Sequence, residues 1–227
     1  MIAIKDKIIA IDGPAGSGKS TLGRQLAETL GYLYFDTGVM YRVVTSAALG
    51  RGLDLKDETL ITALAQHLLI DVHPASLQDG RENDIFADGV DVTWEIRKPE
   101  VDAHVSIVAA YPGVRKALGE QQRRVGLRGR VVMVGRDIGT VILPDADVKI
   151  YLDASAEERA RRRYRERLAR GEQANYDEIL RMIRLRDELD TNRAVSPLRP
   201  AEDAIILASD DMDIHQVLEK AKELVGE

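Results

Sequence analysis

The sequence contains no cysteine, and its four histidines are scattered over 227 residues. A disulfide framework, a thiolate nucleophile and a cysteine zinc site are therefore excluded, and the histidines form no obvious metal cluster. No apolar run approaches the ~18 residues that a transmembrane helix needs, so we expect no membrane span. Residues 1–7 lead into a strand pattern without a basic leader or a cleavage site, so we also expect no targeting segment.

Positive charge is in the minority, with 32 Lys and Arg against 38 Asp and Glu and a formal net charge of −6. A protein that mainly grips a nucleic-acid backbone needs a basic face, so this balance disfavours nucleic acid as the partner. The 44% hydrophobic content and the chain length fit one globular domain, or one domain with a sizeable insertion.

The first fifty residues alternate between strand and helix patterns. An apolar run at 8–11 predicts a strand buried on both faces, and Leu residues at fourfold spacing predict a helix over 19–30. A short strand at 32–35 follows, and then a helix that Asp36 or Thr37 can cap. This alternation is typical of a parallel α/β sheet.

The middle of the chain differs, because Asp88-Gly89 lies between short strand patterns and is a strong hairpin signal. We therefore predict an insertion over 60–108 with its own small antiparallel sheet, mounted on an α/β core formed by 1–59 and 109–227. In that core we expect helices at 112–127, 155–170, 176–193 and from 214, and strands at 131–134, 148–152 and 204–207.

The segment from Gly13 to Ser20 satisfies G-x-x-x-x-G-K-[ST], between a predicted strand and a predicted helix. Such a loop brings backbone N–H groups together around phosphate oxygens, and Lys19 adds a full positive charge. Ser20 is then the expected Mg²⁺ ligand. A glycine turn that merely packs explains the glycines but not Lys19 and Ser20 together. The predicted ATP-binding residues are Gly13, Pro14, Ala15, Gly16, Ser17, Gly18, Lys19, Ser20 and Thr21.

A nucleotide cradle alone does not separate kinases from switches and motors. The sequence has no Asn-Lys-x-Asp element, which reads guanine in typical GTPases, and the strand at 131–134 ends in Gly135-Arg136 rather than in an acidic pair. Both absences weaken the GTPase and motor interpretations. A kinase of a small acid such as shikimate, and a nucleotide-dependent switch without transfer activity, remain as alternatives.

Several motifs together resemble the bacterial cytidylate kinases, a family of nucleoside monophosphate kinases. They are 13–21, 36–42, 91–97, 106–115, 135–141 and Arg193-x-x-x-Pro197-Leu198. The resemblance covers essentially the whole chain and implies transfer of the ATP γ-phosphoryl group to CMP or dCMP, with Mg²⁺, by a monomeric cytoplasmic enzyme of pyrimidine metabolism. Thr37 stands where the family often has Ser, and the hydroxyl is retained.

The resemblance also implies the acceptor site. Thr37, Arg42 and Arg136 would face the acceptor phosphate, Ser106, Arg115 and Asp137 would surround cytosine, and Arg186, Asp190 and Arg193 would hold the ribose and base. A carboxylate and a hydroxyl suit the cytosine amino group, whereas uracil would present an acceptor to an acceptor. From the residues alone, Arg42 on a helix surface, an Asp137 ion pair with an arginine and a solvated ladder over 186–193 are the alternatives.

Seven arginines lie between 159 and 170, interleaved with glutamates. Fourfold neighbours such as Glu158 and Arg162 indicate that most of this run is a solvated, internally paired helix. Arg159 and Arg163 share a face, and the resemblance implies a mobile lid over about 155–175 that closes these two arginines on the donor phosphates. With Lys19 and Arg136, they complete the predicted catalytic set.

Overall fold

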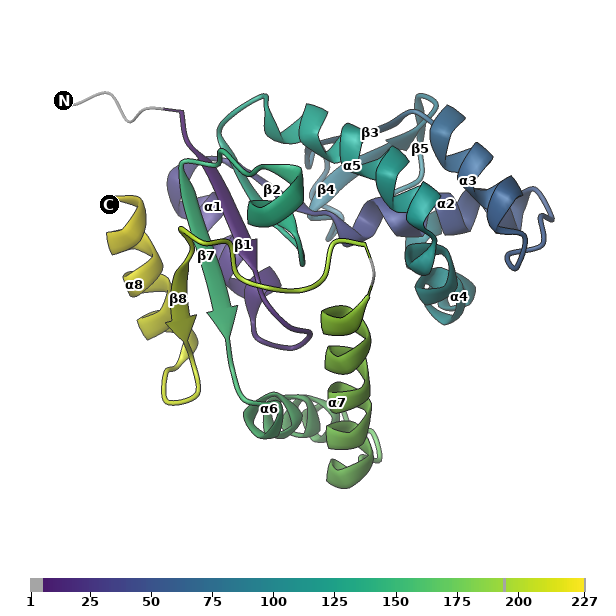
Figure 1. Cartoon of the computed structure of the whole chain (residues 1–227). Helices are drawn as coiled ribbons and strands as arrows, with labels where there is room; N and C mark the ends of the chain where they lie inside the picture. Colours follow the sequence, from purple (N-terminus) through teal and green to yellow (C-terminus); the bar gives the residue numbers. More distant parts are fainter. Residues whose placement is uncertain (1–5, 194, 227) are drawn as a thin grey trace. The chain divides into compact units, whose positions relative to one another are not determined.

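The computed structural model describes residues 6–193 and 195–226, so most of the N-terminal stretch in which no targeting segment is expected lies outside it. A parallel five-stranded sheet has the order β2-β6-β1-β7-β8, and a three-stranded antiparallel sheet has the order β3-β4-β5 (Figure 1). The predicted α/β class with a small antiparallel sheet is therefore confirmed. The strands are β1 (Ile8–Asp12), β2 (Leu33–Asp36), β3 (Ile70–Pro74), β4 (Asn83–Ala87), β5 (Val90–Asp91), β6 (Val131–Val134), β7 (Val148–Asp153) and β8 (Ile205–Ala208).

Helices join most of these strands, together with two short turns, the 3₁₀ turn η1 (Glu95–Arg97) and the π-helical turn η2 (Ile138–Ile142). The helices are α1 (Lys19–Leu30), α2 (Gly38–Gly50), α3 (Glu58–His67), α4 (Pro99–Ala110), α5 (Pro112–Gly126), α6 (Ala156–Ala169), α7 (Tyr176–Asn192) and α8 (Ile214–Val225). No helix in the described part of the chain is both long and apolar enough to cross a membrane.

The chain forms two compact units, and the first comprises the residues before 33 and after 131. In it β1 runs parallel to β7, with Ile9 opposite Val148, and β7 runs parallel to β8. α8 packs against α1 and β7, and α6 packs against α7 at the end to which the β7 arrow points (Figure 1). Ala160, Ile179 and Ile183 form the buried core between α6 and α7.

The second unit, 33–131, holds α2 to α5 and the small antiparallel sheet. The predicted hairpin joins β4 to β5 through Asp88 and Gly89, whose φ values of 49° and 81° are those of a type I′ turn. The predicted insertion over 60–108 lies within this unit, and its limits as a domain stay a prediction. Helix α4 was not predicted; it begins at Pro99, a favoured first helical residue.

Candidate active site

The glycine-rich loop between β1 and α1 has the backbone of a phosphate cradle. Gly13 has a φ of 147°, and a Cβ there would lie 2.1 Å from the Leu152 carbonyl oxygen, so a side chain cannot be accommodated. Gly18, with a φ of 97°, is the N-cap of α1 in the left-handed region. These two glycines let the loop turn tightly onto the amino end of α1, where N–H groups and the helix dipole favour an anion.

Two buried side chains of the loop fit a phosphate ligand. The Lys19 ammonium is buried and donates to the Pro14 carbonyl at 2.7 Å. The Ser17 hydroxyl is also buried, and none of the residues that the structure describes gives it a hydrogen-bond partner. A buried polar group without a partner is costly, and a phosphate oxygen in the cradle would supply one.

Ser20 follows Lys19 and is exposed in the first turn of α1, where its hydroxyl can be a ligand for Mg²⁺. Within residues 6–193 and 195–226, no group of three or more His, Cys, Asp or Glu could hold a metal ion. Mg²⁺ is commonly held by substrate phosphates and waters with one or two protein oxygens. The donor set therefore fits a nucleotide-bound Mg²⁺ better than a cation caged by protein.

Asp12 precedes the cradle and fastens it to the segment after β6. Its two carboxylate oxygens accept from the backbone N–H groups of Ile138, at 2.8 Å, and Gly139, at 2.7 Å. Burial raises the pKa of this carboxyl to about 6, although the two backbone donors act in the opposite direction. Sequence reasoning missed Asp12, because nothing local to it indicates distant backbone partners.

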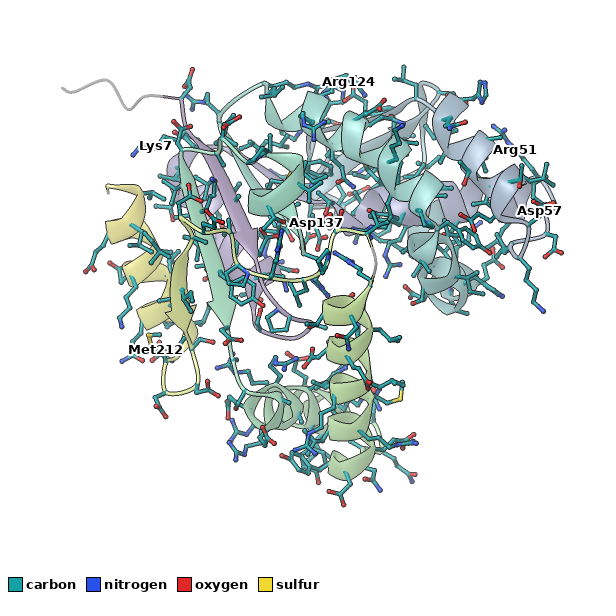
Figure 2. All side chains as sticks on the ribbon, in the orientation of Figure 1. Lys7, Arg51, Asp57, Arg124, Asp137 and Met212 are labelled. Atoms are coloured by element: carbon teal, nitrogen blue, oxygen red, sulfur yellow. The ribbon has the colours of Figure 1, made fainter. Side chains whose placement is uncertain are left out.

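The segment that Asp12 fastens carries Arg136 and Asp137, and both contact the end of α7. Arg136 Nε donates to Asp190 at 3.0 Å. Arg193 lies 3.7 Å from Asp190 and 3.7 Å from Asp137, the residue labelled in Figure 2. Four of the residues predicted to bind the acceptor nucleotide are thus brought together, with cations and carboxylates in alternation: Arg136, Asp190, Arg193 and Asp137. The ion-pair alternative for Asp137 describes its contact with Arg193.

Arg186 lies near the same cluster. Although the residue remains exposed, its pKa is lowered by partial desolvation of the guanidinium and then by the neighbouring Arg136 cation. Arg186, Asp190 and Arg193 are therefore more than a ladder of ion pairs along α7. Asp190 and Arg193 also pair with Arg136 and Asp137, which follow β6. The concentration of arginine in this cluster suits an anionic ligand.

The second unit carries the other predicted acceptor residues. Thr37 is buried at the start of α2, where Asp36 Oδ1 accepts from the Gly38 N–H at 2.9 Å. One turn later Arg42 Nη1 donates to the Ile96 carbonyl at 3.2 Å and pairs with Asp102 on α4. Arg42 is therefore held against neighbouring elements.

Ser106 and Arg115 lie on α4 and α5 of the same unit. Ser106 is exposed one helical turn after Asp102, on the face of α4 that contacts Arg42. The Arg115 guanidinium stacks 5.6 Å from the centre of the Tyr41 ring, next to Arg42 in the sequence. Thr37, Arg42, Ser106 and Arg115 thus belong to the second unit and Asp137 to the first, so their joint recognition of cytosine stays a prediction.

The two predicted lid arginines have different surroundings. Arg159 is buried, and its guanidinium donates to the Ala154 and Ala15 carbonyls and to Asp187. Arg163 is exposed, and the described part of the structure gives it no hydrogen bond or ion pair. Elsewhere in the run Glu158 pairs with Arg161 and Arg162, at 3.1 and 3.2 Å, which confirms the predicted intrahelical pairing.

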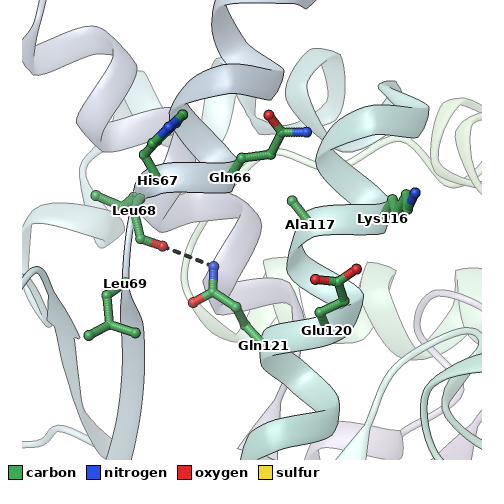
Figure 3. Close-up of a pocket in the computed structure, with 8 residues that line it drawn as sticks. All are labelled: Gln66, His67, Leu68, Leu69, Lys116, Ala117, Glu120 and Gln121. Carbon is green, nitrogen blue, oxygen red and sulfur yellow. Dashed lines mark hydrogen bonds between the residues drawn. The ribbon is translucent and has the colours of Figure 1, made fainter.

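A cavity of about 450 Å³ lies in the second unit between the end of α3 and α5, and none of the predicted site residues lines it (Figure 3). The Gln121 amide on the cavity wall already makes hydrogen bonds to the protein backbone. Its Nε2 donates to the Leu68 carbonyl at 2.9 Å, and its Oε1 accepts from the Ile70 N–H at 2.8 Å. Lys116 and Glu120 on the same wall carry opposite charges. The lining therefore indicates no particular ligand.

A nucleotide cradle on a parallel α/β sheet, with a separate arginine and carboxylate cluster, defines a P-loop kinase. The chain belongs to the cytidylate kinase family, whose model matches residues 9–227. A protein of Roseiflexus castenholzii described as cytidylate kinase is 53% identical to this chain over 212 residues, which cover 93% of this chain and 90% of that protein. The corresponding protein of Carboxydothermus hydrogenoformans shares 50% over 218 residues, covering 96% of each chain.

The cytidylate kinase of Bacillus velezensis shares 48% identity over 217 residues, covering 96% of this chain and 95% of that protein. Among solved structures, a shikimate kinase from Bacteroides thetaiotaomicron aligns over 96% of this chain and 98% of that chain, with a TM-score of 0.49 and 14% identity. A likeness at that level carries no information about the substrate.

Proposed function

We propose that this chain transfers the γ-phosphoryl group of ATP to CMP or dCMP and so forms ADP and CDP or dCDP. The observation that carries the proposal is the presence of cations for two phosphates in the first unit: Lys19 in the cradle, and Arg136 in the cluster with Arg186 and Arg193. A small-acid kinase needs no second nucleoside pocket. Membership of the cytidylate kinase family supports the choice of acceptor.

The reaction needs positioning and charge neutralisation more than a strong base. An anionic oxygen of the acceptor phosphate attacks the γ-phosphorus, the bond to the bridging β,γ-oxygen breaks, and ADP leaves with that oxygen. Lys19 and the loop N–H groups hold the donor phosphates, while Arg42 and Arg136 hold the acceptor phosphate. Thr37 adds a hydroxyl contact. Mg²⁺ supplies further neutralisation when bound, and Ser20 would be its protein ligand.

The base of the nucleotide that receives the phosphoryl group is recognised by hydrogen-bond acceptors and a donor whose arrangement fits cytosine. Asp137 and Ser106 accept from its amino group, and Arg115 donates to ring N3 and O2. Uracil presents a carbonyl where cytosine presents the amine, so it leaves carboxylate and carbonyl oxygens facing each other. Arg186, Asp190 and Arg193 hold the ribose and base, with Asp190 accepting from a sugar hydroxyl.

The lid proposal concerns residues 155–175. Arg163 is the stronger candidate for a donor-phosphate contact, because it is exposed and the Arg159 guanidinium already donates to Ala15, Ala154 and Asp187. Closure of this segment would exclude water and limit ATP hydrolysis. We further propose a monomer that acts on small-molecule nucleotides in the cytoplasm.

Coupled detection of ADP tests the reaction, with Mg-ATP and each acceptor offered separately against a blank without acceptor. The acceptors are CMP, dCMP, UMP, AMP, GMP and shikimate. Fast turnover chiefly with CMP and dCMP is expected. Turnover equal to the blank with every acceptor would favour the nucleotide switch, and preference for shikimate would favour the small-acid kinase.

A further inference from the structure

Arg81 is the centre of a charged network in the second unit. It lies in the loop between β3 and β4, and only 5% of its side chain is exposed. The guanidinium donates to three carboxylates: Asp79 at 2.9 Å, Asp84 at 2.8 Å and Asp91 at 2.8 Å. The same cation holds the pKa of the Asp79 carboxyl well below its usual range. One buried arginine therefore binds three separate points of the chain.

Two of these carboxylates lead from Arg81 to the segment 93–97, which contains η1. Asp79 Oδ2 accepts from the Trp94 indole Nε1 at 3.1 Å. Asp91 Oδ1 accepts from the Thr93 N–H at 2.9 Å, and the Thr93 hydroxyl accepts from the Ile85 N–H at 2.9 Å. Two carboxylates bound to Arg81 thus fix the start of the segment: Asp91 holds Thr93, and Asp79 holds Trp94.

The segment 93–97 also contacts Arg42. Ile96 is buried, and its carbonyl accepts from Arg42 Nη1 at 3.2 Å. Arg97 covers the outer face of the segment, with its guanidinium 4.8 Å from the centre of the Trp94 ring. A shift of this segment would therefore move a carbonyl that orients the Arg42 guanidinium.

We propose that Arg81 is a positioning residue for acceptor binding: through Asp79 and Asp91 it fixes the segment 93–97, whose Ile96 carbonyl orients Arg42. This inference rests on the proposed role of Arg42 toward the acceptor phosphate. A planar guanidinium is required at position 81, because an ammonium cannot direct donors at three fixed carboxylates in the same way. Arg81 touches no substrate and acts only through Arg42.

The decisive variant is Arg81→Lys, compared with Arg51→Lys as a matched control. Arg51 lies in the same unit, its side chain is 55% exposed, and its nearest carboxylate is Asp88 at 3.9 Å. We expect R81K to raise the KM for CMP about three- to tenfold, the effect of losing one or two hydrogen bonds. The KM for ATP and kcat should change less than about twofold, because the carboxylates that Arg81 contacts lie in the second unit whereas Lys19 of the cradle lies in the first. R51K should change none of the three.

A double-mutant cycle separates positioning from general stability. If Arg81 acts through Arg42, R81K should raise the KM for CMP much less in an R42K background than in the wild type. Partial unfolding would instead lower kcat per total protein and leave KM unchanged. Multiplicative effects on KM, or an unchanged KM in R81K, would overturn the proposal.

Trp94 is the only tryptophan of the chain, so its emission reports on the segment 93–97 without turnover. CMP alone should change the Trp94 emission of the wild type and of R51K, with a midpoint that R81K shifts to higher CMP concentration. No emission change on saturation with CMP would contradict the link between the segment and the acceptor site.

If R81K does not fold, Asp79→Asn and Trp94→Phe decide the matter, because each weakens the same arm and leaves Arg81 in place. An unchanged KM for CMP in both would overturn the proposal. Failure of the proposed function gives a different result, since the wild type would then form no CDP. A wild type that turns over CMP but whose KM is unaffected by R42K would retain the reaction and remove the role of Arg42, and with it this inference.

Discussion

Arg159 and Asp187 form a two-point ion pair between α6 and α7, with Nη1 to Oδ1 at 2.9 Å and Nη2 to Oδ2 at 2.6 Å. The same guanidinium donates to the Ala15 carbonyl of the cradle at 3.0 Å and to Ala154 at 2.8 Å. Asp187, on α7, therefore fixes an arginine that joins the cradle, the end of β7 and α6, the helix of the predicted lid.

Replacing Asp187 with Ala should destabilise the protein, because it leaves the buried Arg159 charge without its carboxylate. Removal of one partner from a fully buried pair costs 3–5 kcal/mol, and since Asp187 is partly exposed we expect a loss of about 2 kcal/mol in the free energy of unfolding. Denaturant unfolding measures it. Glu188→Ala, the exposed neighbour, is the control and should change stability by less than about 0.5 kcal/mol. Equal stability of the two variants would contradict this account.

Much of the fold follows from local patterns. The cradle, the alternating elements around it and the Asp88-Gly89 turn each have a short-range cause: a glycine requirement, an apolar run or a positive φ. Helix α4 escaped prediction because its apolar residues are not confined to one face: Ile107 is exposed beside the buried Val108, so no single apolar stripe stands out.

The candidate site was predictable only in part, for a different reason. Asp102, Asp187 and Asp12 bind arginines or backbone groups that are distant in the sequence, and no local pattern identifies such partners. The i, i+4, i+7 spacing of Arg186, Asp190 and Arg193 did indicate a shared face, but not that Arg136 and Asp137 lie against it. Tertiary charge pairs are set by the whole fold.

Replacing Lys19 with Met tests the cradle. The methylene stem is kept in its buried position, while the cation that faces developing phosphate charge is lost. We expect kcat to fall about 10²- to 10³-fold, the usual cost of one charged or hydrogen-bonding stabiliser of the transition state. The coupled assay with CMP measures it, and circular dichroism checks that the fold is retained. Near-normal turnover would remove Lys19 from the catalytic set.

Asp102 pairs with Arg42, the side chain proposed to bind the acceptor phosphate, and therefore competes with that phosphate. Asp102→Asn should lower the KM for CMP about two- to fivefold, since exposed ion pairs contribute up to about 1 kcal/mol. The control is Glu100→Gln, also in the first turn of α4, which should leave KM unchanged. A higher KM in D102N would instead mean that Asp102 orients Arg42 for binding.

Asp12 should make stability depend on pH in an unusual direction. Its pKa is raised from 3.8 to about 6 by burial, so between these values the folded protein binds more protons than the unfolded chain. Stability contributed by this group therefore falls as pH rises from about 4 to 6, and each unit between the two pKa values corresponds to about 1.4 kcal/mol. Carboxyls with depressed pKa values, such as Asp91, act with the opposite sign and at lower pH.

The comparison with Asp12→Asn isolates this contribution, because the other carboxyls are present in both proteins and cancel. The variant also loses one carboxylate acceptor for the Ile138 and Gly139 N–H groups, but that loss does not titrate. We expect the difference in unfolding free energy, wild type minus D12N, to decline by about 1 to 3 kcal/mol between pH 4 and 6.5 and to stay level above pH 7. A difference that is constant with pH would show that Asp12 titrates alike in the folded and unfolded chain, and a rising one would mean that its two backbone donors outweigh burial.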